Sequence, residues 1–337
     1  MNNTYDKQKM AAQLEWIATI RGIAALLVFL SHLPLNMPYK TRFVIGRIGV
    51  TAFFLISGYL AVGSRRNSNW KRYLLNRFFR IYPVYWILLL LMCLVMEKSK
   101  LTTWRIVANV TCFQEFLGQE NILGASWMLP IQIVFFVILA IAGIEVFDSK
   151  SDGDTNGDKK CICTITLFSL LAIVVGSLRF LTGKPFPTAF FLLINVAFLG
   201  VFHKTRKESE ISNKGWMIAL GIFEATLIIA VIISYQDMFI HYVGAYNLGM
   251  LLMFLAEKAD INIKFFKWLG SIGFTFFLGA DIPYVLIKRF VDLSSTVGLR
   301  IVGSIVKFLL ALLFAYIVTR YIEKPLQKKV RPIINRL

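Results

Sequence analysis

Two polar residues in the first apolar segment have types and a spacing that could support chemistry. Arg21 and His32 stand eleven residues apart in a run that is otherwise mostly apolar. Eleven residues make about three helical turns, so on a helix both side chains lie on one face, about 16 Å apart along the axis. Ionisable residues are costly to place in a bilayer and by default mark a functional site. A neutral histidine beside a hydroxyl can act as a general base.

Each of these residues also has a simpler explanation. Arg21 could extend to the headgroups at one membrane surface, and His32 could end the helix just before Pro34. Two such residues on the same helix face favour the alternative, a polar track through a helix bundle. The sequence therefore makes Arg21 and His32 the first candidates for a catalytic site.

The composition indicates a membrane protein. Of the 337 residues, 57% are hydrophobic and 17% are charged, whereas a soluble domain has about 25% charged residues. Lys and Arg number 37 against 19 Asp and Glu. In a soluble chain this excess would suggest nucleic acid, but cytoplasmic loops that face anionic lipid explain it more simply. We therefore expect an all-α, polytopic membrane helix bundle that contacts lipid and has no nucleic-acid partner.

Apolar runs long enough to cross about 30 Å recur along the chain and predict ten spans. The expected spans are 14–35, 43–63, 82–97, 127–147, 161–181, 186–203, 215–236, 239–257, 267–290 and 299–321. The loops 64–81 and 203–214 and the tail from Arg320 are net basic, so the positive-inside rule places them in the cytoplasm. Ten spans then put both termini in the cytoplasm as well.

A basic segment follows the second expected span. Within it, Arg77 and Arg80 are three residues apart, share a helix face and could bind phosphate bidentately. A phosphate-rich donor such as coenzyme A would suit them. A positive-inside anchor accounts for the same charge without any ligand.

Other motifs are weak or absent from the sequence. The four cysteines lie in or beside apolar runs and lack partner ligands at zinc spacing, so we expect no metal site. The chain has no P-loop pattern, which argues against a transport ATPase.

Taken together, the motifs resemble the acyltransferase 3 family of integral-membrane O-acyltransferases. Arg21 and His32 frame ten residues of the first span, and Arg77-Phe-Phe-Arg80 follows the second. Four further segments agree with the family in order: 46–60, which ends in Ser-Gly-aromatic-Leu and holds Ser57 and Tyr59; 80–86, Arg-Ile-Tyr-Pro-Val-Tyr-Trp; 126–129, which holds Trp127; and 321–326, which holds Glu323 in Glu-Lys-Pro-Leu. The resemblance covers about residues 14–326.

The resemblance implies a fold and a reaction. The expected organisation is a cytoplasmic tail over 1–13, a membrane domain over 14–326 and a basic cytoplasmic tail over 327–337, with no appended SGNH domain. The reaction would move an acyl group, usually acetyl, from cytoplasmic acetyl-CoA to a hydroxyl of a cell-surface or lipid-linked carbohydrate. Such enzymes need no metal, and the implied location is a bacterial plasma membrane.

The resemblance also implies residue roles. His32 would be the catalytic base or relay, with Arg21 as its motif partner. Arg77 and Arg80 would serve on the donor side with the help of Arg72. The other motif or pocket candidates are Ser57, Tyr59, Trp127, Gln132, Asp281 and Glu323.

Two positions depart from the family pattern. Gln132 stands where the family usually has a glutamate after Trp-x-Leu-x-x, and an amide cannot act as a base. Asp281 stands where the family often has the histidine of His-x-Pro. Asp281 is either a substitute polar group or a sign of altered activity.

Two other classes of membrane protein stay open. A transporter or flippase of a glycan precursor or small solute would also have ten helices and intramembrane polar groups, although we find no paired repeats with broken helices. A different acyltransferase superfamily uses an Asn and a His deep in the bundle. Asn195 and His203 fit this poorly, because they sit at one end of a single short helix. We also expect His203 to begin a solvated cytoplasmic loop.

Overall fold

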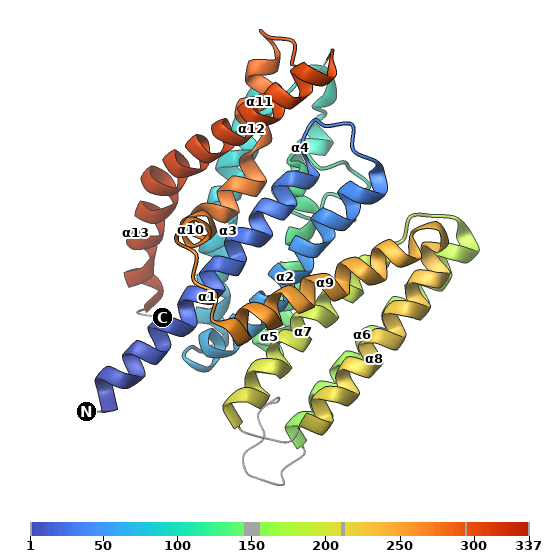
Figure 1. The fold of residues 1–337 in the computed structure, drawn as a ribbon, viewed down its shortest axis with the longest axis vertical. Helices are drawn as coiled ribbons and strands as arrows, with labels where there is room; N and C mark the ends of the chain where they lie inside the picture. Colours follow the sequence, from blue (N-terminus) through green and yellow to red (C-terminus); the bar gives the residue numbers. More distant parts are fainter. Residues whose placement is uncertain (1, 145–155, 210–212, 294, 336–337) are drawn as a thin grey trace. The chain divides into compact units, whose positions relative to one another are not determined.

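The computed structural model describes residues 2–144, 156–209, 213–293 and 295–335, and every regular element in these ranges is helical (Figure 1). This confirms the predicted all-α class. The α-helices are α1 (Asn2–Ser31), α2 (Tyr39–Arg66), α3 (Trp70–Val95), α4 (Thr103–Val110), α5 (Leu129–Ala142), α6 (Asn156–Thr182), α7 (Thr188–Ser209), α8 (Asn213–Ser234), α9 (Phe239–Ala259), α10 (Lys264–Gly279), α11 (Asp281–Lys288), α12 (Val297–Val318) and α13 (Lys324–Asn335). Short 3₁₀ turns are η1 (Lys98–Lys100), η2 (Gly124–Met128) and η4 (Gln236–Met238), and η5 (Thr319–Glu323) is a π-helix.

The membrane-spanning character of the chain is confirmed by the length and apolarity of its helices. Within the described ranges, eight helices are long and apolar enough to cross a membrane, or up to nine when the bent pair α10 and α11 counts as one span. The number of ten spans stays a prediction.

Two spans differ from their predicted bounds for clear physical reasons. The third begins at Trp70 rather than near residue 82, because charged side chains mark the edge of the hydrocarbon region and not the end of a helix. The predicted span 267–290 is broken into α10 and α11, which meet at an angle of 47°. Pro283 lies in the first turn of α11, where it cannot donate a backbone hydrogen bond to the carbonyl four residues earlier.

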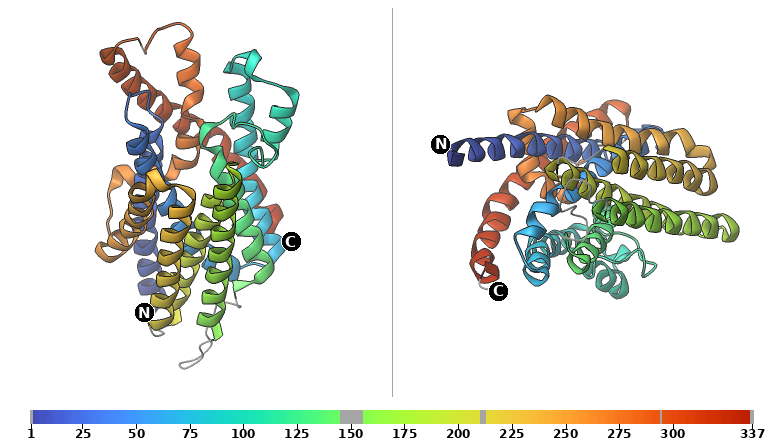
Figure 2. Two further views of the ribbon diagram at one scale, coloured as in Figure 1. Left: turned by 90° about the vertical axis from the view of Figure 1, so that its right-hand side faces the viewer. Right: turned by 90° about the horizontal axis from the view of Figure 1, so that it is seen from below.

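The chain divides into two compact units. The first contains Met1–Gly49, Leu75–Pro130 and Ala256–Leu337, and the second contains Val50–Leu74 and Ile131–Leu255. In the second unit α6 packs against both α7 and α8 (Figures 1 and 2). There Phe168 stacks on Phe198 at 5.6 Å between ring centroids. Buried aromatic and aliphatic side chains thus form the interior of this unit.

In the first unit, α1 packs along α10 (Figure 1). Two glycines let the backbones touch. A Cβ atom at Gly22 would lie 2.0 Å from the carbonyl oxygen of Phe266, and one at Gly270 would lie 2.2 Å from that of Ala18. Small residues at such crossings are typical of membrane helices, because close backbone approach maximises van der Waals contact. This packing fixes α1, the helix that carries Arg21 and leads to His32.

The close crossing makes a prediction for Gly270→Ala. The added methyl group overlaps backbone that cannot move away, and overpacking of this kind costs about 1–3 kcal/mol. We expect a lower midpoint of thermal unfolding for the detergent-solubilised variant, followed by size-exclusion chromatography after heating. Gly221→Ala on α8 is the matched control, since nothing lies within 4 Å of its added Cβ atom. Equal thermal stability of the two variants would show that α1 and α10 are not in backbone contact.

Candidate active site

His32 follows the last turn of α1 and is exposed. Its Nδ1 atom lies 2.9 Å from the carbonyl oxygen of Val28 and 3.0 Å from the hydroxyl of Ser31. A carbonyl oxygen only accepts hydrogen bonds, so Nδ1 of the neutral ring carries the hydrogen. We therefore assign the tautomer in which Nε2 has a free lone pair. In this form Nε2 can accept a proton from a hydroxyl group.

The buried side chain of Lys307 fixes the backbone at His32. Lys307 of α12 is 3% exposed, and its ammonium group donates a 2.6 Å hydrogen bond to the carbonyl oxygen of His32. The same nitrogen is 2.6 Å from Oδ1 of Asp281. The rings of Phe29 and Tyr284 lie 5.8 and 5.5 Å from it. A buried ammonium group is costly unless it is paired and hydrogen-bonded, so Lys307 links α12, the start of α11 and the end of α1.

The η2 turn borders the same place. A methyl group at Gly124 would lie 3.7 Å from Oδ2 of Asp281, 3.8 Å from Cδ2 of His32 and 4.0 Å from its Nε2. These are ordinary van der Waals distances, so a methyl group fits beside Gly124 without overlap. The acidic oxygen of Asp281 and the basic nitrogen of His32 therefore border one small space.

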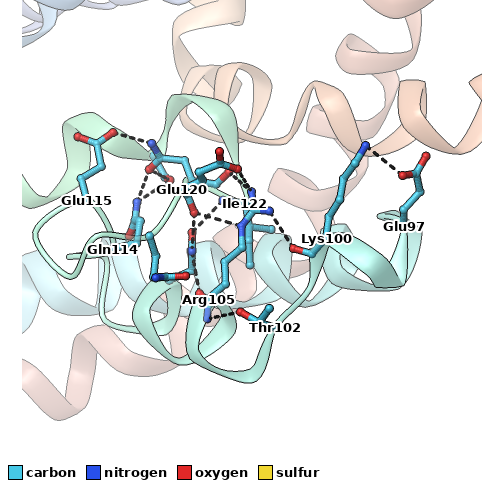
Figure 3. Close-up of polar contacts among 12 residues, drawn as sticks. Glu97, Lys100, Thr102, Arg105, Gln114, Glu115, Glu120 and Ile122 are labelled. Carbon is cyan, nitrogen blue, oxygen red and sulfur yellow. Dashed lines mark hydrogen bonds and ion pairs between the residues drawn. The ribbon is translucent and has the colours of Figure 1, made fainter. Parts of the chain in front are cut away.

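A polar network in the preceding segment holds η2 in place (Figure 3). Arg105 donates hydrogen bonds to the carbonyl oxygens of Lys100 at 2.8 Å and of Asn121 at 3.1 Å, and pairs with Glu120 at 3.3 Å. Asn109, which is buried, accepts a 2.9 Å bond from the backbone of Ile122. These side chains of α4 satisfy backbone groups in the stretch before η2 that have no helical partner, and so they hold that stretch in place.

The network reaches η2 through Gln114. Its amide donates a 3.0 Å hydrogen bond to the hydroxyl of Ser126, and Asn121 accepts a further 3.0 Å bond from that hydroxyl. Beside it, Trp127 lies under the guanidinium group of Arg47, 5.0 Å from the ring centroid. Trp127, predicted as a motif residue, thus belongs to the turn that carries Gly124.

Three arginines gather at a second place in the first unit. The charges that act on Arg80 are, in decreasing order, those of Arg21, Arg77 and Glu323. Arg21 in turn interacts with Glu323 and Arg77. Three guanidinium groups therefore lie near the carboxylate of Glu323, which concentrates positive charge at this place. These four residues form what we call the arginine cluster, which can attract an anion.

Glu323 is held within the π-helical turn η5. Its Oε2 atom accepts hydrogen bonds of 3.3 Å from the hydroxyls of Thr275 and Thr319, and its Oε1 accepts a 3.1 Å bond from Gln327. A π-helical turn in an α-helix often marks a functional site. Here it presents the Glu-Lys-Pro-Leu carboxylate to the arginine cluster.

The remaining predicted residues belong to the second unit. Gln132 donates a 3.0 Å hydrogen bond to the hydroxyl of Ser57. Tyr59 is buried and lies 4.8 Å beneath the ammonium group of Lys204. Arg72 lies in the first turn of α3, where its backbone N–H donates to the side chain of Asn69 at 2.8 Å. Their place relative to His32 stays a prediction.

One expectation about this unit was wrong. His203 is not at the start of a solvated loop but is buried on α7, with its ring 5.5 Å from that of Trp216 and 5.1 Å from that of Phe254. The basic residues around it suggested a loop, but α7 continues to Ser209. The side chains of Asn195 and Ser169 of α6 share a 3.0 Å hydrogen bond, which is an interhelical contact.

Sequence reasoning missed Lys307 and Gly124. Lys307 could have been recognised from the sequence, because a single lysine in the apolar run of the last span is rare unless it has a partner. No sequence pattern identifies Gly124, because its role depends on the space between two side chains from other segments.

Comparison with known proteins adds one finding. A family model described as an acyltransferase domain matches residues 14–320. No curated protein and no solved structure matches the chain.

The segment before η2 also makes a prediction about Cys112. Burial raises the pKa of its thiol to about 12, above the usual value of about 8.5. Since the thiolate is the reactive form, we expect Cys112 to be almost inert to a maleimide at pH 7.5. In a variant that retains only Cys112, mass spectrometry should find little labelling before denaturation in SDS and complete labelling after it. Rapid labelling of the folded protein at pH 7.5 would contradict the burial of Cys112.

Proposed function

The chain belongs to the acyltransferase 3 family, and from this premise we propose that it is a membrane O-acetyltransferase that acts on carbohydrate hydroxyls. The family match supports a membrane acyltransferase. The observation that carries the chemistry is the hydrogen bond from Nδ1 of His32 to the carbonyl of Val28, which leaves Nε2 as a proton acceptor.

The donor is acetyl-CoA, whose phosphates are polyanionic. The arginine cluster contains three guanidinium groups against one carboxylate, and arginines bind phosphate through charge-assisted, often bidentate hydrogen bonds. Arg77 and Arg80 would hold the phosphates, while Arg21 extends the positive charge onto α1. Arg72, in the first turn of α3, stays a predicted helper of this donor site.

The acceptor reacts at His32. Nε2 takes the proton of a sugar hydroxyl as the hydroxyl oxygen attacks the thioester carbonyl. The carbon–sulfur bond then breaks, the acetyl group stays on the sugar oxygen as an ester, and the proton passes from His32 to the leaving thiolate. Coenzyme A departs as the free thiol, so atoms and charge balance without a metal or redox partner.

The acceptor is a surface or lipid-linked glycan, and the protein is a multi-pass component of a bacterial plasma membrane. Basic loops on the side of the arginine cluster support a cytoplasmic donor site. His32 lies about three helical turns away along α1, which supports access of the acceptor from the opposite side.

The first test of this proposal is His32→Ala. General-base catalysis contributes about 10²–10⁴-fold in rate, so the variant should release thiol from acetyl-CoA at least about 100-fold more slowly. The assay uses purified protein in nanodiscs with a panel of methyl hexopyranosides as acceptors. His241→Ala on α9 is the matched control and should retain the wild-type rate. A His32→Ala variant with the wild-type rate would refute the mechanism, and glycoside movement without thiol release would favour a transporter.

A second test addresses the donor site through Arg77→Gln and Arg80→Gln. A hydrogen bond to a charged group contributes about 1.5–3 kcal/mol, so each variant should raise the KM for acetyl-CoA about tenfold or more. Lys288→Gln removes one exposed positive charge from α11 and should change nothing. Acetyl-dephospho-CoA lacks one phosphate. The wild-type protein should therefore have a higher KM for it than for acetyl-CoA. Unchanged KM values in both arginine variants would exclude the arginine cluster as the donor site.

A further inference from the structure

We propose that Asp281 and Gly124, together with His32, form the subsite that binds the acceptor, and that Asp281 selects sugars with a second hydroxyl beside the reacting one. This inference rests on the proposed function and deepens it. Asp281 is also one of the two positions, with Gln132, at which the sequence departs from the family pattern that it resembles.

The carboxylate of Asp281 is held at one oxygen and turned toward open space with the other. Oδ1 is 2.6 Å from the ammonium group of Lys307, which is itself buried. Oδ2 faces the position beside Gly124, and 31% of the Asp281 side chain is exposed. Because Lys307 also binds the carbonyl oxygen of His32, one ammonium group fixes the carboxylate relative to the catalytic residue.

The space between Gly124, Asp281 and His32 can hold a methyl-sized group and is bordered by two hydrogen-bond acceptors. A methyl group placed on Gly124 would meet Oδ2 of Asp281 and the ring of His32 at 3.7–4.0 Å, so a group at least as large as a methyl fits between them. Both bordering atoms accept hydrogen bonds, since Oδ2 belongs to a carboxylate and Nε2 has a free lone pair. A ligand that matches both must therefore bring two hydrogen-bond donors that lie near one another.

A vicinal diol of a pyranose provides such a pair. One hydroxyl gives its proton to Nε2 of His32 and reacts. Its neighbour donates a charge-assisted hydrogen bond to Oδ2 of Asp281, stronger than a bond between neutral groups. Lys307 keeps the carboxylate oriented, while Gly124 leaves room for the ring carbon between the two hydroxyls.

The experiment compares acceptors as well as variants. Methyl α-D-galactopyranoside and its 2-, 3-, 4- and 6-deoxy derivatives are the probes, and initial rates of thiol release from acetyl-CoA give KM and kcat for each. In the wild-type protein, one deoxy derivative should lose the reaction because it lacks the reacting hydroxyl. A second, modified at the neighbouring carbon, should show a KM at least about tenfold higher, because its bond to Asp281 is missing.

Asp281→Asn keeps the shape of the side chain and removes its charge. It should raise the KM for the parent glycoside about tenfold, leave the KM for acetyl-CoA unchanged and abolish the discrimination against the second deoxy derivative. If Asp281 serves only to pair with Lys307, the variant will instead lower kcat equally for all acceptors and keep that discrimination, which would overturn the proposal.

Gly124→Ala provides an independent variant should Asp281→Asn fold poorly. The added methyl group occupies the proposed subsite and should raise the acceptor KM at least about tenfold with no change for acetyl-CoA. Gly298→Ala on α12 is the control, since no atom lies within 4 Å of its added Cβ.

The outcomes separate the two proposals. If His32→Ala is inactive while Gly124→Ala and Asp281→Asn keep the wild-type acceptor KM, the subsite is refuted and the acetyltransferase stands. If the wild-type protein releases no thiol with any glycoside, the proposed function is refuted and the subsite with it.

Discussion

The ammonium group of Lys307 is the contact on which the geometry around His32 depends. It is buried in an apolar helix and binds two oxygens at 2.6 Å, one from the carbonyl of His32 and one from Asp281. Removing either partner would leave part of a buried charge unsatisfied, which is far more costly than losing an exposed ion pair. The end of α1, the break between α10 and α11 and the middle of α12 are thus held by one nitrogen atom. The substitution at Asp281 is therefore accompanied by a partner that makes a carboxylate tolerable there.

A second constraint is the close contact of α1 with α10. The glycines at this crossing bring the backbones together, and α10 in turn supplies Thr275, which binds Glu323. The arginine cluster and the surroundings of His32 consequently share the same scaffold, with α1 running between them. The positive charges of the arginine cluster repel one another, and a bound anion would reduce this repulsion.

The sequence predicted most of the helices because long apolar runs leave few alternatives in a membrane. It did not predict that α3 begins at Trp70, since a charge pattern marks the membrane boundary rather than the helix boundary. The candidates Arg21, His32, Arg77, Arg80 and Glu323 could be identified because they lie in local motifs. Lys307 and Gly124 could not be assigned roles, because their importance arises from side chains far away in the chain. Burial of His203 was missed for a related reason, as helix α7 extends through a basic segment.

The central proposal is that α1 connects a cationic donor site at Arg21 to a catalytic histidine, His32, on the other side of the membrane. The most direct measurement uses sealed vesicles that contain the purified protein and a trapped methyl glycoside, with radiolabelled acetyl-CoA added only outside. Neither compound crosses a lipid bilayer readily. The account predicts labelled glycoside inside the vesicles and free coenzyme A thiol outside. Labelled product that forms only when the glycoside and acetyl-CoA are on the same side would contradict it.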